Sequence, residues 1–269
     1  GRGAVALDEI YYRASGRPAD FAGVAYQQKE RVMKELFASE VRNLGWQLGQ
    51  LAEQDRFGRD LTLRELEEAL VTVTACLPVY RTYIRDFTVA ARDRMYLERA
   101  VAEAVLRRPA AGPAVAFLRR VLLLDFPDYL PAELRPAWLR FVMRWQQFTG
   151  PVMAKGFEDT ALYVYNRFIA LNEVGGDPGT TGVPVAEFHR RNRRRQEYWP
   201  HTLNATSTHD TKRSEDVRER LNVLSEIPAA WSVRLNRWRR WNRPKKPVVK
   251  GRSVPDGNTE IFLYQTLLG

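Results

Sequence analysis

Apolar residues at helical spacing fill most of the first half of the chain and restrict the folds open to it. They recur at steps of three and four, which places them on one face of a helix: Met33, Phe37, Val41, Leu44, Leu48 and Leu51. Thr62 and Glu65 have the spacing of a capping box, and an apolar helical pattern follows them. Further helices are predicted over about 91–108, 113–124 and 138–148. The first half is therefore predicted to be mostly helical.

The rest of the chain mixes short strand-like segments with helices. Strands are predicted at 79–84, 151–156 and 204–208, helices at about 185–198 and 214–224, and loops at 172–183 and 243–257. An aromatic stripe at Trp231, Trp238 and Trp241 predicts one more helix that packs against a core. So few strands, each followed by a helix, do not make a complete sheet.

The pattern predicts an α/β fold: the mostly helical C-terminal portion of a (β/α)8 TIM barrel that carries a helical insertion. On this interpretation residues 1–269 are one partial catalytic barrel domain. The insertion occupies about 20–75, and about 77–269 form the last barrel strands and helices. The start has no initiator Met and no signal-peptide pattern, and the end is apolar and aromatic, so we expect both ends to have been cut from something longer.

Composition narrows the classes of protein. No apolar run approaches the length of a membrane span, so no membrane partner is predicted. The single cysteine, Cys76, excludes an internal disulfide and favours a reducing, cytoplasmic location; it lies in an apolar run and is expected to be a buried, inert thiol. The net charge of +10 comes mainly from arginine, with clusters at 190–195 and 234–246. Without a nucleic-acid-binding motif, solvated helix faces explain these clusters better than a nucleic-acid site.

His209 and Asp210 form the leading candidate site. A short segment of small and β-branched residues precedes them, and a run of charges follows, including Lys212 and Arg213. Strand ends in barrel enzymes present catalytic groups in this way, because their side chains converge on one open face. An imidazole beside a carboxylate can orient sugar hydroxyls and stabilise a developing positive charge.

A second candidate is the stretch Lys155-Gly156-Phe157-Glu158-Asp159-Thr160. Glu158 and Asp159 could supply an acid and a base, or they could cap the helix that follows. Glu173 and Asp177, in a glycine-rich loop, either contact a ligand or hold a turn. His189 and His201 have no metal-ligand spacing to each other or to Cys76, and no cofactor motif is present, so neither metal nor cofactor is predicted.

These residues lie within stretches that resemble the C-terminal part of the catalytic domain of the maltooligosyltrehalose synthase family, a branch of the α-amylase superfamily. The matching stretches cover nearly the whole chain in order: 29–44, 78–84, 146–166, 171–178, 207–217 and 264–269. The two longest, QQFTGPVMAKGFEDTALYVYN at 146–166 and KERVMKELFASEVRNL at 29–44, are specific to this family.

The resemblance implies a retaining mechanism on a maltooligosaccharide, in which the reducing-end glucose moves from an α-1,4 to an α,α-1,1 link. It implies that Asp210 stabilises the transition state and that His209 binds a hydroxyl. It also implies that Lys155, Glu158, Asp159, Lys212 and Arg213 contact substrate. The family's nucleophile and general acid lie on earlier strands, and no segment here matches them. The missing N-terminal half of the barrel is thus an expected partner.

Two other functions remain open. One is another hydrolase or transglucosylase of the α-amylase superfamily that acts on α-glucans, which would differ in its product. The other is a basic module for RNA or another anionic polymer, which would bind with a steep dependence on salt.

Overall fold

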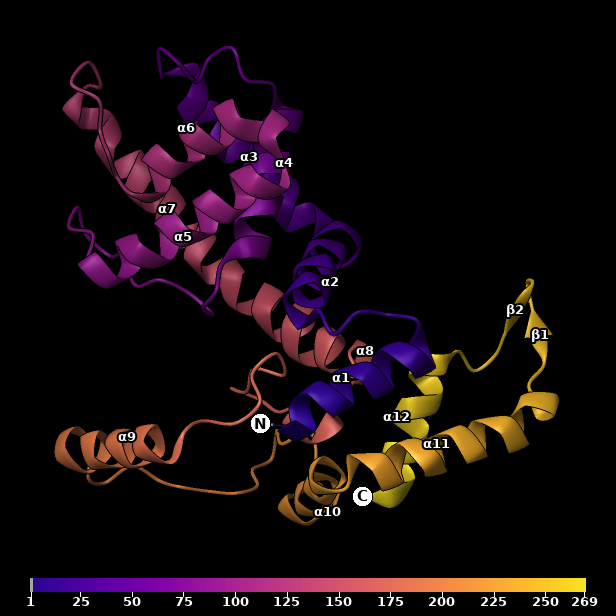
Figure 1. Cartoon of the computed structure of the whole chain (residues 1–269). Coiled ribbons are helices and arrows are strands. Elements are labelled where there is room, and N and C mark those ends of the chain that lie inside the picture. Colours follow the sequence, from indigo (N-terminus) through magenta and orange to yellow (C-terminus); the bar gives the residue numbers. More distant parts are fainter. Residues whose placement is uncertain (1) are drawn as a thin grey trace. The chain divides into compact units, whose positions relative to one another are not determined.

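The computed structural model describes residues 2–269, with the side chain of Arg2 left aside, and this part of the chain is mostly helical (Figure 1). It divides into two compact units. Unit 1 consists of the described residues up to Val24 together with Ala161–Gly269, and unit 2 consists of Ala25–Thr160.

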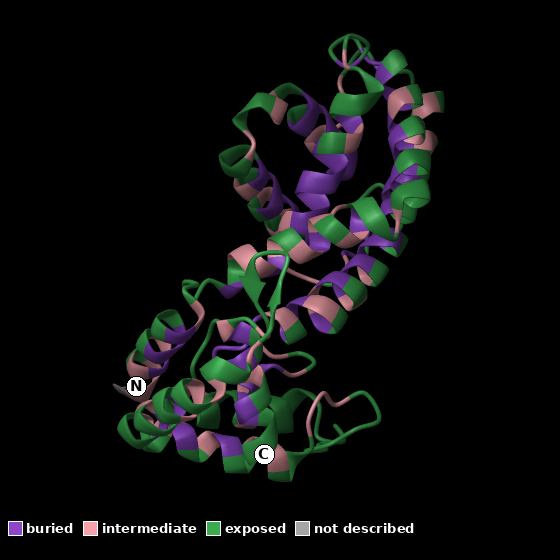
Figure 2. Ribbon diagram, turned by 90° about the vertical axis from the view of Figure 1, so that its right-hand side faces the viewer, coloured by how far each residue is buried: buried purple, intermediate pink, exposed green. Residues whose placement is uncertain are grey.

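Unit 2 is a bundle of helices around one apolar core. Its helices are the greater part of α2 (Phe21–Glu35), then α3 (Ala38–Glu53), α4 (Leu63–Cys76), α5 (Ala91–Arg107), α6 (Gly112–Leu122) and α7 (Arg135–Val152), with 3-10 turns at Pro109–Ala111 and Ala132–Leu134. The buried residues lie where these helices face one another (Figure 2). Helix α4 contacts α3, α5 and α6, and it is buried on nearly every side from Ala69 to Ala75, as a central helix requires.

Local sequence signals fix both ends of α4. The predicted capping box is confirmed: Thr62 Oγ1 accepts from the Glu65 N–H, and Glu65 Oε2 accepts from the Thr62 N–H at 2.8 Å. The helix ends at Cys76 because Pro78 disfavours helical geometry at Leu77, whose ψ is 123°. The helices predicted near 91–108, 113–124 and 138–148 are likewise present as α5, α6 and α7.

The apolar stripe from Met33 to Leu51 is divided between two helices, contrary to the prediction of a single helical face. Helix α2 ends at Glu35, and the N–H groups of Leu36 and Phe37 both donate to Val32 O, at 2.8 and 3.0 Å. The Phe37 ring packs edge-on against Phe148, with 5.9 Å between ring centroids. A tertiary contact therefore accompanies a break that the sequence does not mark with glycine or proline.

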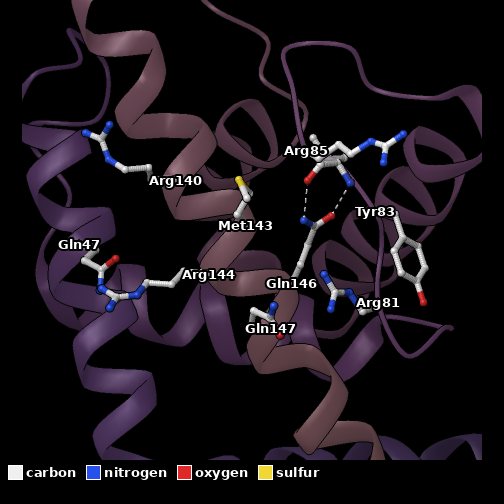
Figure 3. Close-up of a pocket in the computed structure, with 10 residues that line it drawn as sticks. Gln47, Arg81, Tyr83, Arg85, Arg140, Met143, Arg144, Gln146 and Gln147 are labelled. Carbon is white, nitrogen blue, oxygen red and sulfur yellow. Dashed lines mark hydrogen bonds between the residues drawn. The ribbon is translucent and has the colours of Figure 1, made fainter.

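The strand predicted at 79–84 is absent, although its alternation is real. Thr82 and Ile84 are buried, whereas Tyr83 is exposed. Instead of a neighbouring strand, the side chain of Gln146 pairs with this segment: its Oε1 accepts from the Ile84 N–H at 2.7 Å, and its Nε2 donates to Ile84 O at 2.8 Å (Figure 3). Its Oε1 also accepts from Thr82 Oγ1 at 2.9 Å. One carboxamide thus satisfies backbone groups that a strand ladder would otherwise satisfy.

The strand predicted at 151–156 is also absent, because α7 runs through Pro151 to Val152 and continues as a π-helix over Met153–Ala161. Proline removes an N–H and disturbs the ordinary helical ladder, and wider turns are one way to continue past it. Thr160 Oγ1 donates to Lys155 O at 2.7 Å within this π-helix. A short helix, α8 (Leu162–Val164), follows in unit 1.

Unit 1 is built around α1 (Arg2–Ser15). That helix contacts α10 (Glu215–Glu226), α11 (Pro228–Asn242) and α12 (Gly257–Leu268). Trp231 and Leu235 of α11 are buried, and Trp238 packs against Tyr264 with 5.4 Å between ring centroids, as the predicted core role requires. Trp241 is exposed instead and lies against Arg237. Helix α9 (Val185–Tyr198) has the predicted bounds, has no buried residue, and stands away from the other helices of this unit (Figure 1).

The strand predicted at 204–208 is irregular, exposed backbone. Among the described residues the strands are β1 (Val248–Val249) and β2 (Arg252–Ser253), a short antiparallel hairpin within the predicted 243–257 loop. A barrel strand needs neighbours on both sides for its backbone hydrogen bonds, and no other extended segment of this unit pairs with 204–208. No helix among residues 2–269 is long and apolar enough to cross a membrane.

Replacing Gln146 by leucine is expected to lower the free energy of unfolding by about 2–4 kcal/mol, because it leaves the buried N–H and C=O of Ile84 without partners. The measurement is denaturant unfolding of Gln146→Leu. Gln147→Leu is the matched control, since Gln147 is adjacent and exposed and should change stability by well under about 1 kcal/mol. Equal losses in the two variants would contradict this role for Gln146.

Candidate functional site

His209 and Asp210 lie in a tight turn at the exposed surface of unit 1. Threonines on either side close the turn: the Thr208 N–H donates to Thr211 Oγ1 at 2.6 Å, and the Thr211 N–H donates to Thr208 O at 3.3 Å. Hydroxyl side chains often stabilise turns by bonding to nearby backbone. The turn therefore presents an imidazole and a carboxylate side by side in sequence, both open to a ligand.

Glu173 anchors the backbone directly after this turn. Its carboxylate accepts from the Lys212 N–H at 2.8 Å and from the Arg213 N–H at 3.3 Å, and Arg218 lies 3.7 Å from the same carboxylate. The sequence left Glu173 as either a ligand contact or a turn residue. The structure shows a positioning role: one loop carries a carboxylate that holds another loop, about 40 residues further along the chain.

Lys212 and Arg213 lie over aromatic rings. The Lys212 ammonium is 5.7 Å from the centre of the Tyr163 ring, and the Arg213 guanidinium is 5.7 Å from that of Phe262. Burial lowers the pKa of Arg213 from its ordinary value, and its Nη1 is buried without a hydrogen-bond partner. Cation–π contacts therefore help to hold both cations beside the turn.

The same turn is tied to α10. Ser207 Oγ accepts from the Glu215 N–H at 3.1 Å and bonds to the Glu215 carboxylate, while Arg218 donates to Thr206 O. The stretch from Ser207 to Arg218 is therefore one locally folded piece. Among its charged side chains, Glu215 bonds to Ser207, Arg218 bonds to Thr206 O and lies near Glu173, and Arg213 lies over an aromatic ring.

The second candidate group lies in the π-helix of unit 2. Lys155 Nζ pairs with Asp159 Oδ2 at 2.7 Å at the exposed surface. Glu158 is only 6% exposed, and its Oε1 has no hydrogen-bond partner. Neither acid caps the helix start as the alternative interpretation proposed. Because π-helical turns are often found at functional sites, the geometry keeps this group as a candidate.

Helix α2 crosses this π-helix at Gly156. A Cβ added at Gly156 would lie 2.7 Å from Lys29 Cα, so glycine permits the close approach. The stem of Lys29 is buried there, and its Nζ donates to Leu77 O at 3.0 Å. Burial lowers the pKa of Lys29 to about 8, because the charged ammonium loses its hydration.

Cys76, also in unit 2, is half-buried and free, and burial raises its pKa to about 11. A thiol with such a pKa is a poor nucleophile at neutral pH, which agrees with the predicted inert role. No group of three or more His, Cys, Asp and Glu side chains within residues 2–269 has a geometry that could hold a metal ion.

Several residues that sequence reasoning missed hold the irregular stretch 162–172 beneath the candidate turn. Asn172 Nδ2 donates to Leu162 O and Tyr165 O at 2.7 and 2.6 Å. Gln265 of α12 donates to Asn166 O and accepts from the Ile169 N–H, each at 2.9 Å. Asn258 Nδ2 donates to Val164 O at 3.0 Å. Asn172 and Gln265 lie inside stretches of family resemblance, which was their only sequence signal, and Asn258 had none.

The fold and these motifs can now be compared with known proteins. No family model matches the chain. Solved structures that match nearly its whole length are trehalose-forming synthases. One is a maltooligosyltrehalose synthase from Arthrobacter ramosus (30% identity, TM-score 0.77, 98% of this chain and 30% of that one), and another is a DSM5389 glycosyltrehalose synthase (30% identity, TM-score 0.67, 99% of this chain and 28% of that one).

The sequence comparison agrees. A Mycobacterium tuberculosis protein named "Putative maltooligosyl trehalose synthase" is 41% identical over 130 residues, or 47% of this chain and 15% of the relative. The resemblance predicted from the sequence is therefore confirmed: the chain is homologous to part of the maltooligosyltrehalose synthases, and it spans about 30% of the length of the solved structures it matches.

Removing the Glu173 carboxylate is expected to loosen the turn that carries His209 and Asp210. In Glu173→Ala, the amides of Lys212 and Arg213 lose their acceptors, so their hydrogen exchange should be faster by about tenfold or more. Asp177→Ala is the control: Asp177 is in the same loop but bonds only to Gly179 and Thr180 there. Unchanged exchange at both amides in Glu173→Ala would show that Glu173 does not hold the turn.

Lys29 is expected to make stability rise with pH. Its folded pKa of about 8 lies below its ordinary value of 10.5, so between these values the unfolded chain binds more protons. The free energy of unfolding of the wild type, relative to Lys29→Met, should therefore rise by about 3 kcal/mol from pH 7 to pH 10.5, and this comparison cancels groups common to both proteins. A flat difference between the wild type and Lys29→Met over this pH range would refute the assignment.

Proposed function

We propose that this chain is part of an enzyme that rearranges the reducing end of a maltooligosaccharide, moving the terminal glucose from an α-1,4 to an α,α-1,1 link. The single observation that carries the proposal is that two stretches of family resemblance, 171–178 and 207–217, meet in space. Glu173 of the first holds Lys212 and Arg213 of the second by their backbone. The contact gives the His209–Asp210 turn a fixed place in unit 1.

In this proposal Asp210 is the carboxylate that stabilises the positive charge of an oxocarbenium-like transition state. Retaining enzymes of this kind also need a nucleophile and a general acid. We propose that neither is present in this chain, and that both come from a barrel half to which the turn belongs. His209 then binds a hydroxyl of the reacting glucose, and the half-buried cations Lys212 and Arg213 hold neighbouring hydroxyls.

We propose that the π-helix group belongs to the same reaction. Lys155 and Asp159 are exposed and paired, an arrangement that can bind the hydroxyls of an acceptor sugar. The buried Glu158, with one oxygen unpartnered, has a hydrogen-bonding position still to fill. Isomerisation also requires that water be excluded from the glycosyl-enzyme intermediate while the released glucose changes its orientation in the site.

The exposure of the turn supports a larger protein around it. Leu203, just before the turn, is 95% exposed, and every residue from 201 to 210 is exposed. The irregular backbone of this segment leaves N–H and C=O groups that a neighbouring strand could pair. We propose that residues 204–208 end a strand of a (β/α)8 barrel in the whole enzyme, where neighbouring strands supply the missing hydrogen bonds, and that this enzyme is cytoplasmic.

The alternatives have less support. Part of the basic cluster at 190–195 is neutralised within α9, because Arg190 and Arg191 both pair with Glu187 at 2.7 and 2.5 Å. Arg239 and Lys246 pair with Glu260 in the same way. Internal ion pairs weaken the case for a binding surface for nucleic acid. Another α-glucan enzyme of the same superfamily remains the second candidate, and its product would distinguish it.

The test uses the longest reading frame that contains this chain, assayed with maltohexaose for loss of reducing ends and for non-reducing, trehalose-ended products. Asp210→Asn should lower kcat by about a thousandfold or more with little change in KM, because the lost charge acts mainly in the transition state. Asp177→Asn, in a loop of the same unit, should keep the activity. The 269 residues alone should leave the reducing ends of maltohexaose intact.

Three outcomes would overturn the proposal. One is loss of reducing ends caused by the 269 residues alone, since the covalent step would then need no second half. Another is full activity of Asp210→Asn. The third is release of shorter reducing sugars by the whole protein, which would assign it to the hydrolases.

A further inference from the structure

A cavity of about 920 Å³ opens on unit 2, and none of its lining residues belongs to the candidate site. It lies between α3, α7 and the segment that follows α4 (Figure 3). Arg140 and Arg144 reach it from α7, Gln47 from α3, and Arg81, Tyr83 and Arg85 from the segment after α4. Its volume is that of a site for a small organic molecule.

Every charged residue that lines the cavity is positively charged. Four of its lining residues are arginines, and none of the lining residues is acidic. Within the described residues, none of these four guanidinium groups pairs with a carboxylate. Some other arginines of unit 2 do pair, such as Arg119 with Glu98, Arg120 with Asp55, and Arg108 with Glu30 and Glu68; what distinguishes the four is that they line one cavity. Four like charges around one cavity repel one another, and an anion bound among them would offset that repulsion.

The wall that carries two of these arginines is held rigidly. Along the irregular segment Thr82 and Ile84 point into the protein and bond to Gln146, so the alternation turns Arg81, Tyr83 and Arg85 toward the cavity. The Tyr83 N–H also donates to Asp93 Oδ2 at 3.1 Å. The Arg81 guanidinium lies 5.0 Å from the centre of the Tyr83 ring. A binding wall fixed before the ligand arrives loses less entropy on binding.

A second groove of about 320 Å³ adjoins the cavity and shares Gln47, Arg144 and Gln147 with it. Its other walls are largely apolar and include Phe37, Leu44 and Phe148. Glu40 lies in this groove, so its carboxylate directs an anion toward the arginines. The organic part of a ligand thus has an apolar surface to lie on, next to the charged end.

We propose that this cavity binds a small phosphate-bearing metabolite, with the phosphate held by the arginines of α7 and of segment 81–85. Arginine suits this role because its planar guanidinium donates paired hydrogen bonds to phosphate oxygens. A neutral sugar would leave the four charges unbalanced. The site is independent of the His209–Asp210 turn and of the proposed sugar rearrangement.

The experiment is isothermal titration calorimetry of the full chain, in low-salt buffer without phosphate, with three probes: inorganic phosphate, glucose 6-phosphate and glucose. Both phosphate compounds should bind and glucose should not. If glucose 6-phosphate binds more tightly than inorganic phosphate, the natural ligand is a phosphate ester; equal affinities indicate free phosphate. Added salt should weaken binding, because the attraction is between charges.

The paired variants separate this site from general surface charge. Arg140→Gln with Arg144→Gln should weaken phosphate binding by about tenfold or more, since two charge-assisted contacts are lost. Arg42→Gln with Arg99→Gln removes two exposed arginines of unit 2 outside the cavity and should leave the affinity within about twofold. Both double variants should unfold at the wild-type denaturant midpoint.

Absence of heat with both phosphate compounds at millimolar concentration would overturn the proposal. Equal weakening in the two double variants would overturn it as well, because the attraction would then be a property of the whole basic surface. Binding of glucose or maltohexaose that is lost in the Arg140/Arg144 variant, without any binding of phosphate, would assign the cavity to neutral sugars instead.

Discussion

Buried backbone without a regular partner is the constraint on which much of this structure depends, and polar side chains satisfy it. Gln146 bonds to the backbone of Ile84 in unit 2, and Asn172 and Gln265 bond to the backbone of 162–172 in unit 1. Unpaired buried N–H and C=O groups are costly, so each of these segments would otherwise have to become regular or move into water. A few amide side chains therefore decide where the irregular, chemistry-bearing segments lie.

Polar side chains that bond to backbone groups also position the residues of both proposed sites. Glu173 does this with a carboxylate, which accepts hydrogen bonds from two backbone N–H groups next to the His209–Asp210 turn. In unit 2, Gln146 holds Thr82 and Ile84 inward and so turns the arginines of that segment outward. In each case a residue that does not itself contact a ligand fixes the position of the residues that we propose to bind one. Loss of the anchor should therefore affect the site before it affects the bulk of the fold.

Sequence reasoning succeeded where the signal was local. The capping box at Thr62 and the bounds of α9 depend on neighbouring residues alone, and both were predicted correctly. Sequence reasoning failed where a residue far away in the sequence determines the local structure. The alternation at 79–84 was real, but its partner is the side chain of Gln146 about 60 residues away. The break at Phe37 accompanies a contact with Phe148. Helix α7 continues through Pro151 into a π-helix, which no periodicity in the sequence predicted.

The candidate site shows the same division. Motif resemblance selected the stretches that matter, yet many residues inside them are supports: Asn172 and Glu173 hold backbone, and Gly156 permits the crossing of Lys29. Few residues in these stretches are both exposed and chemically active, chiefly His209, Asp210 and the Lys155–Asp159 pair. Residues that hold the backbone must fit one fold in detail and are numerous, whereas the residues that react occupy only a few positions. A resemblance of this kind is therefore strong evidence for architecture, and the chemistry depends on the small exposed set and on what surrounds it.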